Sequence, residues 1–175
     1  GFNNSAVTKL EQVKTSLSNV ESSYQRRSDV ISGLVNTVKG VANFEQEVLT
    51  EVVQARASAG QTTIDLSNLN SSNINEFTQA QQALSGALSR LLVTVERYPE
   101  LKATQNFLEF QSQLEGTENR INVERNRYNE AINTYNTHIK IFPNAIYAQW
   151  LGFGEEFERF TSSEGSQNAP EIDFN

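Results

Sequence analysis

The sequence predicts an all-α protein folded as an antiparallel up-and-down four-helix bundle. Only three prolines and nine glycines interrupt its 175 residues. Apolar residues recur every three or four positions over long tracts, which is the period of an amphipathic helix. These tracts are also rich in good helix formers such as Gln, Glu, Ala, Leu and Lys. The low hydrophobic share of 37% indicates a lean core and an elongated bundle.

The first two helices are expected at about residues 5–30 and 33–58. Their stripe comprises Val7, Leu10, Val13, Leu17, Val20, Tyr24, Ile31, Leu34, Val38, Leu49 and Val52. Arg27 interrupts it, and Ser32-Gly33 follows. Unbroken phase favours the alternative, in which both helices fuse into one long rod. Length matching favours a turn near residues 29–33, because four rods of similar length close a bundle, and we predict that turn.

The third helix is expected at about residues 73–98, after a long polar loop. Residues 58–73 lose the helical period and collect Gly, Thr, Ser and Asn. Ser72 or Asn73 is a suitable N-cap, since short polar side chains accept hydrogen bonds from the first free amides of a helix. Pro99 is expected to end this helix, because proline lacks the amide that a helix interior needs.

The fourth helix is expected at about residues 104–141, where Pro143 follows the end of its stripe. A short apolar helix near residues 144–151 comes next. Residues 1–160 would then form a single helical-bundle domain. The final residues 161–175 are expected to be a flexible tail, since they are rich in Ser, Gly, Asn and acidic side chains.

Composition argues against a nucleic-acid partner and against a membrane-spanning helix within these residues. The chain carries 14 basic and 21 acidic residues, a net charge of −7. A basic stripe for nucleic acid is therefore not expected. No run of about 18 apolar residues occurs, so these residues contain no predicted membrane-spanning helix.

Known catalytic and cofactor patterns are missing from the sequence. It has no cysteine, and its one histidine, His138, follows Tyr135 rather than a glutamate at the spacing that di-iron bundles use. Neither a phosphate-binding glycine loop nor a nucleophile elbow is present. We therefore expect no metal, no cofactor and no enzymatic activity.

Five charged residues form the candidate polar core network: Arg26, Arg27, Asp29, Glu118 and Arg125. Glu118 and Arg125 fall in phase with the apolar stripe of the fourth helix. The preferred interpretation is an ion-pair network that fixes helix register, with Glu118 accepting from Arg26 or Arg27. The alternative is a buried site for a reaction or a small ligand.

An aromatic cluster near the C-terminal end is a candidate interaction patch. It comprises Phe142, Tyr147, Trp150, Phe153, Phe157 and Phe160. The preferred interpretation is a cover over the open end of the bundle core. The alternative is an exposed apolar patch for a protein partner, because the neighbouring glutamates disfavour an anionic lipid surface.

Three blocks of sequence resemble the LemA family of bacterial membrane-anchored helical proteins. They are YQRRSDVISGLVNTVKG, ALSGALSRLLVTVERYPELKATQNF and LEGTENRINVERNRYNEAINTYN, and the closing APEIDF is similar as well. The resemblance implies a four-helix bundle and a hydrophobic anchor ahead of Gly1. The family has a proline where this chain has Ser32, and it offers no established catalytic or ligand residues to carry over.

Together these observations predict a membrane-tethered helical bundle in the bacterial envelope, on a side that the sequence leaves open. It would bind a protein partner or self-assemble as a scaffold. One alternative is an enzyme or ligand-binding bundle that uses Arg27, Glu118 and Arg125. Another is a regulator of an envelope protease or of a membrane-stress response.

Overall fold

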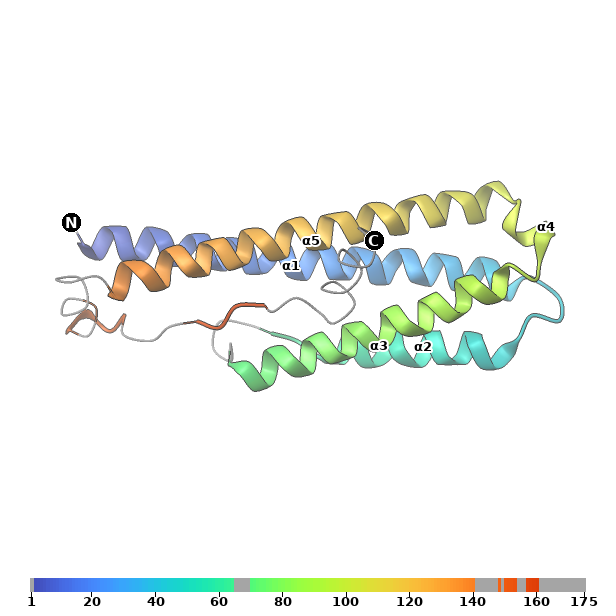
Figure 1. Ribbon diagram of the computed structural model, residues 1–175, viewed down its shortest axis with the longest axis horizontal. Coiled ribbons are helices and arrows are strands. Elements are labelled where there is room, and N and C mark those ends of the chain that lie inside the picture. Colours follow the sequence, from blue (N-terminus) through green and yellow to red (C-terminus); the bar gives the residue numbers. More distant parts are fainter. Residues whose placement is uncertain (1, 65–69, 141–147, 149, 154–156, 161–175) are drawn as a thin grey trace, which may run out of the picture.

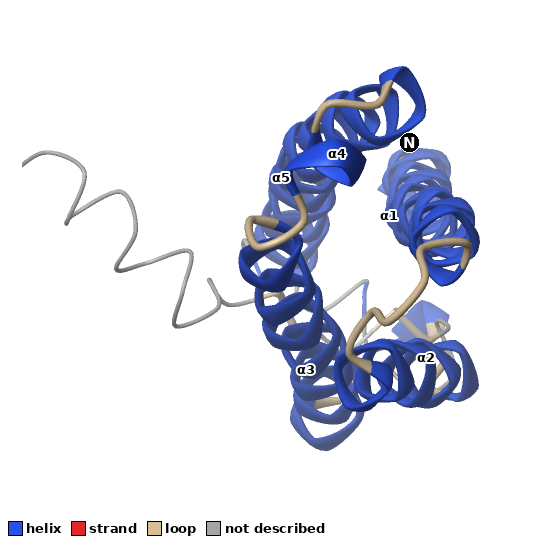
Figure 2. Cartoon of the chain, turned by 90° about the vertical axis from the view of Figure 1, so that its right-hand side faces the viewer, coloured by secondary structure: helices blue, strands red, loops and turns tan. Residues whose placement is uncertain are grey.

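The computed structural model describes residues 2–64, 70–140, 148, 150–153 and 157–160, and this part of the chain is helical with no strand. Its helices are α1 (Phe2–Lys39), α2 (Gln46–Gln61), α3 (Ser71–Val95), α4 (Pro99–Lys102) and α5 (Gln105–Lys140). The four long helices alternate in direction (Figure 1). Seen end-on, they surround a common interior (Figure 2). The prediction of an all-α four-helix bundle is confirmed.

The predicted turn at residues 29–33 is wrong, because α1 continues through Ser32-Gly33 to Lys39. Gly33 serves close packing instead. A Cβ atom at this position would lie 2.5 Å from Cε1 of Phe110 on α5, so the missing side chain makes room for that ring. The fused-rod alternative is also wrong in its length, since the rod ends at Lys39.

The chain reverses direction between Lys39 and Gln46. Gly40 follows the last helical residue, as is common at helix ends, and Asn43 adopts a positive φ of 65°. The Phe44 ring is buried and lies 4.7 Å from the Tyr98 ring, centroid to centroid. The Tyr98 hydroxyl also donates to the Asn43 carbonyl at 3.0 Å. These contacts fix the α1–α2 turn against the α3–α4 corner.

Two smaller boundaries differ from prediction. Asn70, rather than Ser72 or Asn73, caps α3, and its side chain accepts from the Asn73 amide at 2.9 Å. Helix α3 ends at Val95, and Pro99 opens the one-turn helix α4 instead of ending α3. The predicted fourth helix agrees closely with α5.

The four long helices differ greatly in length. The turn between α1 and α2 comes about ten residues later than predicted, which lengthens α1 and shortens α2. α1 and α5 contain 38 and 36 residues, whereas α2 and α3 contain 16 and 25. The α1/α5 pair therefore extends beyond α2 and α3 (Figure 1). Where all four long helices meet they enclose one apolar cluster. A second cluster lies toward the other end, between α1, α5, the start of α3 and residues near the C-terminus.

The C-terminal predictions fall largely outside the described residues. Of the expected helix at 144–151, Ala148, Trp150 and Leu151 are described and helical. Residues 161–175 lie outside the description entirely.

Candidate functional site

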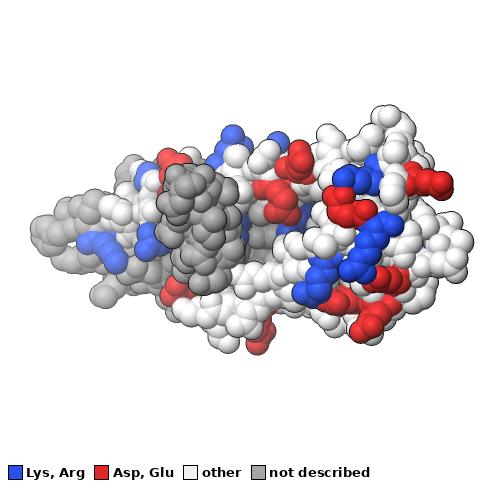
Figure 3. All heavy atoms as spheres, turned by 45° about the vertical axis from the view of Figure 1, so that its right-hand side comes forward, with Lys and Arg blue, Asp and Glu red and all other residues white. Residues whose placement is uncertain are grey.

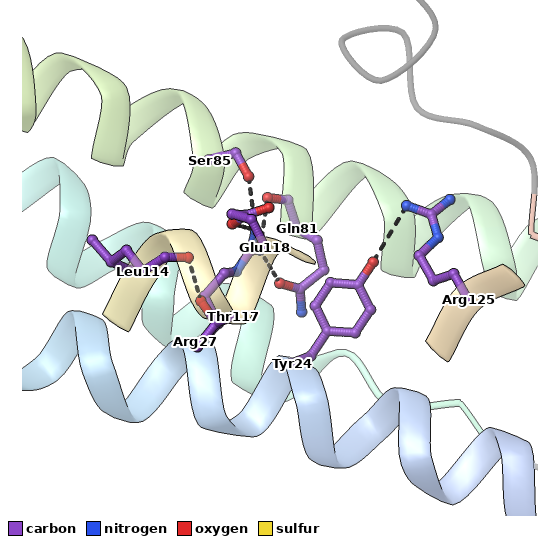
Figure 4. Close-up of polar contacts among 8 residues, drawn as sticks. All are labelled: Tyr24, Arg27, Gln81, Ser85, Leu114, Thr117, Glu118 and Arg125. Carbon is purple, nitrogen blue, oxygen red and sulfur yellow. Dashed lines mark hydrogen bonds and ion pairs between the residues drawn. The ribbon is translucent and has the colours of Figure 1, made fainter. Parts of the chain in front are cut away.

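A buried arginine lies between the two apolar clusters. The Arg27 side chain is only 3% exposed. It donates to the Ser85 hydroxyl at 3.0 Å, to the Gln81 side-chain oxygen at 2.6 Å and to the Glu118 carboxylate at 2.9 Å (Figure 4). We call these four residues the Arg27 layer. It links α1, α3 and α5 by polar contacts at one level of the bundle.

The two charged members of the Arg27 layer differ in their exposure to solvent. Glu118 is 48% exposed, so water shares the solvation of its carboxylate while Arg27 is buried. Nε of Arg27 is buried and has no hydrogen-bond partner among the described residues. Neutral acceptors on Gln81 and Ser85 thus supplement the Glu118 carboxylate as partners of the buried cation.

Tyr24 connects the layer to the second apolar cluster. Burial raises the pKa of its hydroxyl, and the nearby Arg125 and Arg27 cations oppose that rise. Its ring meets Phe77 edge-on, with the ring centroids 5.0 Å apart. The Arg125 guanidinium donates to the Tyr24 hydroxyl at 3.4 Å (Figure 4). Arg125 thus adjoins the layer through Tyr24, whose ring centre lies 5.4 Å from the Arg27 guanidinium carbon.

The other predicted members of the polar network lie outside the layer. Arg26 is exposed and borders an outer groove of about 750 Å³ between α1 and α5, together with Arg120 and Arg127. Asp29 is exposed as well and accepts from the Gln25 side-chain amide at 3.0 Å. Of the five residues, the structure brings Arg27 and Glu118 into direct contact.

A second groove borders the layer on the α3/α5 side. It has a volume of about 630 Å³, and its lining includes Ser85 and Glu118 together with Leu88 and Leu114. Two of the groups that hold Arg27 thus face an open groove whose lining combines polar side chains with three leucines, Leu88, Leu92 and Leu114.

An extended segment, residues 157–160, lies along α5 and is called the strap. The Asn136 side chain donates to the Phe157 carbonyl at 3.0 Å and accepts from the Phe157 amide at 3.2 Å. Asn129 makes the same pair of bonds with Phe160, at 2.9 and 2.8 Å. Each asparagine therefore satisfies both main-chain groups of one strap residue. We call Asn129 and Asn136 the asparagine pair.

Aromatic side chains complete the docking of the strap. Phe160 is 4% exposed, and its ring lies 5.2 Å from that of Tyr128 on α5 and 6.2 Å from that of Phe77 on α3, measured between centroids. Phe157 is half-buried and lies 5.4 Å from Tyr135. Figure 1 shows the segment between the α1/α5 pair and the first turns of α3.

The predicted aromatic patch divides in the structure. Phe142 and Tyr147 lie outside the described residues. Phe153, Phe157 and Phe160 contact the second apolar cluster, whereas Trp150 is 81% exposed. The described members therefore do not form one surface.

Sequence reasoning missed Gln81, Ser85 and the asparagine pair. A usable signal for the pair was present, because Asn126, Asn129, Asn133 and Asn136 recur at helical spacing within one helix. Asparagine is a weak helix former, so a stripe of asparagines indicates that their side chains have other partners.

The described part of the chain offers neither a metal-binding cluster nor a membrane-spanning helix. No group of three or more His, Asp or Glu side chains there could hold a metal ion. None of the described helices is long and apolar enough to cross a membrane. Acidic and basic side chains are interspersed on the face drawn in Figure 3.

Comparison with known proteins identifies the relatives of this chain. The model of the LemA family matches residues 16–174. The chain is 24% identical over 151 residues to Protein LemA of Metamycoplasma hominis, covering 86% of this chain and 65% of that protein. It is 28% identical over 168 residues to the magnetosome proteins MamQ 1 and MamQ 2 of Paramagnetospirillum magneticum, covering 86% of this chain and 61% of each relative. The chain thus spans less than two thirds of the length of these relatives.

Proposed function

Because the chain belongs to the LemA family, we propose that it is a membrane-associated helical-bundle protein that acts through protein–protein contacts, with a partner or with itself. The family and the magnetosome relatives support membrane association. We place the protein in the bacterial envelope and assign it a scaffolding rather than a catalytic role.

The docking of the strap is the observation that carries this proposal. The asparagine pair forms hydrogen bonds with the main chain of an extended segment at two points. Main-chain hydrogen bonds combined with pockets for side chains are a general means of binding extended peptides. The fold therefore holds the elements of a peptide-recognition surface.

The proposal is tested by site-specific photocrosslinking of the full-length protein in its native membrane. A photoreactive residue at Asn133, whose side chain accepts from Arg159 of the strap at 2.7 Å, should yield a recurrent protein adduct identified by mass spectrometry. The matched control is the same residue at Gln54, an exposed position on α2. Adducts confined to the same polypeptide at Asn133, or equal adducts at both positions, would contradict the proposal.

A second candidate is a small-anion site in the α3/α5 groove, which is lined by Ser85 and Glu118. The unpartnered Nε of Arg27 favours it, because this buried donor belongs to a side chain whose partners Ser85 and Glu118 line that groove. Titration with inorganic phosphate should shift the Arg27 side-chain NMR signals, and more strongly in Glu118→Gln, which lacks the competing carboxylate. Signals that stay unchanged in both proteins would remove this candidate.

A further inference from the structure

The asparagine pair and the strap match in spacing. Asn129 and Asn136 are seven residues apart on α5, which is about 10.5 Å along a helix. Phe157 and Phe160 are three residues apart in an extended chain, which is about 10 Å. Each asparagine can therefore meet the amide and carbonyl of the corresponding phenylalanine without distortion. The match predicts a site for an extended Phe-x-x-Phe segment.

Selectivity at this site resides in the two phenylalanine positions. The side chain at 160 is almost fully buried against Tyr128 and Phe77, and the Arg125 guanidinium lies 5.3 Å from the centre of its ring. Between them, the Glu158 main-chain carbonyl accepts from the Tyr128 hydroxyl at 3.4 Å, and the Arg159 side chain donates to the exposed Asn133 side chain at 2.7 Å. An occupant must therefore supply two aromatic residues three positions apart.

The site needs an occupant because α2 is short. Helices α1 and α5 extend past α2 and α3, so the apolar faces of Tyr128, Ile132 and Tyr135 are not enclosed by four long helices. These side chains are nevertheless buried, and the strap helps to cover them. An empty site would expose aromatic surface to water, which is unfavourable.

The connection to the strap is long for the distance that it bridges. Sixteen residues separate Lys140 from Phe157. Asn136 lies only four residues before Lys140, or about 6 Å along the helix axis. Extended, these sixteen residues span up to about 50 Å, a reach that requires Ala148 and Phe153 to leave the second apolar cluster together with the strap. The chain length therefore permits the strap to reach the equivalent site of a neighbouring molecule.

We propose that the α5 groove formed by the asparagine pair also accepts the strap of a second copy of this chain, so that exchanged straps link neighbouring molecules. This inference rests on the proposed protein-contact function and names its partner. Phe157–Phe160 is the one occupant whose fit the structure displays, which is why we choose it over an unrelated protein.

The test mixes two full-length variants with complementary defects. Asn129→Leu/Asn136→Leu removes the paired hydrogen bonds but keeps the strap. Phe157→Ser/Phe160→Ser removes the aromatic anchors but keeps the groove. Each variant alone retains only one of the two features, either the groove or the strap, so each should sediment as a monomer. In an equimolar mixture, the intact strap of one variant can bind the intact groove of the other. The weight-average mass should then approach twice that of either variant.

Controls separate loss of folding from loss of exchange. Circular dichroism establishes that each variant retains its helices. If the double variants lose helicity, the milder pair Asn136→Ala and Phe157→Ala is used, because it acts at the half-buried end of the strap. Asn126→Ala, an exposed position on the same helix, is the matched control and should leave the self-association of the unmodified protein unchanged.

The outcomes are distinct. A mixture whose mass stays monomeric overturns exchange. The proposal is also overturned if a synthetic peptide of residues 153–160 binds the strap-defective variant, which shows that its groove is competent, while no mixed dimer forms. Either of those results leaves intact the protein adduct expected at Asn133 if the partner is a different protein. The proposed function and this inference can therefore fail separately.

Discussion

Gly33→Ala tests whether the glycine within α1 serves close packing. The added Cβ would lie 2.5 Å from Cε1 and 2.7 Å from Cζ of Phe110. Carbon atoms in favourable contact are about 3.5–4.0 Å apart. The Phe110 ring must therefore move by about 1 Å, and it is partly buried against the first apolar cluster.

Two opposing effects determine the size of the change. Alanine is a better helix former than glycine by about 1 kcal/mol. Forcing extra volume into a packed core costs about 1–3 kcal/mol. We expect the clash to exceed the helix propensity, so that Gly33→Ala lowers the free energy of unfolding by about 1 kcal/mol.

Urea unfolding followed by circular dichroism measures this free energy in a double-mutant cycle. In a Phe110→Ala background the clash is absent, and Gly33→Ala should instead stabilise by about 1 kcal/mol, a coupling of about 2 kcal/mol. Gly116→Ala on α5 is the control, since its new Cβ would meet nothing within 4 Å. The reasoning would be refuted if Gly33→Ala stabilised the unmodified protein as much as Gly116→Ala does.

Two further predictions concern the buried polar groups. Arg27→Met should lower the unfolding free energy by about 3 kcal/mol, because it leaves the acceptors on Gln81 and Ser85 without their donor. Glu118→Gln should lower it by only about 1 kcal/mol, because an amide oxygen can still accept from Arg27 and the position is 48% exposed. Denaturant midpoints in the opposite order would show that the carboxylate contributes more than the neutral acceptors. Burial raises the pKa of Tyr128 above the ordinary value of 10.0, so the folded state holds this proton more tightly than the unfolded chain. Stability is then complete below about pH 10 and falls above it by up to about 1.4 kcal/mol per pH unit. Tyr128→Phe should flatten that decline, and an identical slope in both proteins would contradict the assignment.

The helical period was sufficient to predict the fold class, the helix α5 and most of α3. It could not place the first turn. Gly33 is equally compatible with a break and with a close contact, and the choice depends on Phe110, which lies 77 residues further along the chain. The turn at residues 40–45 depends on Phe44 and Tyr98 meeting in three dimensions. Tertiary contacts of this kind leave no periodic trace in a sequence.

The sequence predicted part of the candidate site, and the remainder again depends on tertiary contacts. Arg27 stood out because a charge interrupts an apolar stripe, and Glu118 because it lies in phase with one. Gln81 and Ser85 are ordinary polar residues in a helical tract, so their role follows only from the position of α3 beside α1. The asparagine pair carried a signal in its spacing, but its partner segment could not be located without the fold.

The position of the Arg27 layer has a consequence for how the molecule opens. The layer separates an apolar cluster enclosed by four helices from one that the strap helps to cover. Regions with separate apolar cores can unfold locally with different free energies. The strap end could therefore open and close as its own cooperative unit while the four-helix end keeps its amide protons protected. Binding at one end of this rod would then require little disturbance of the other.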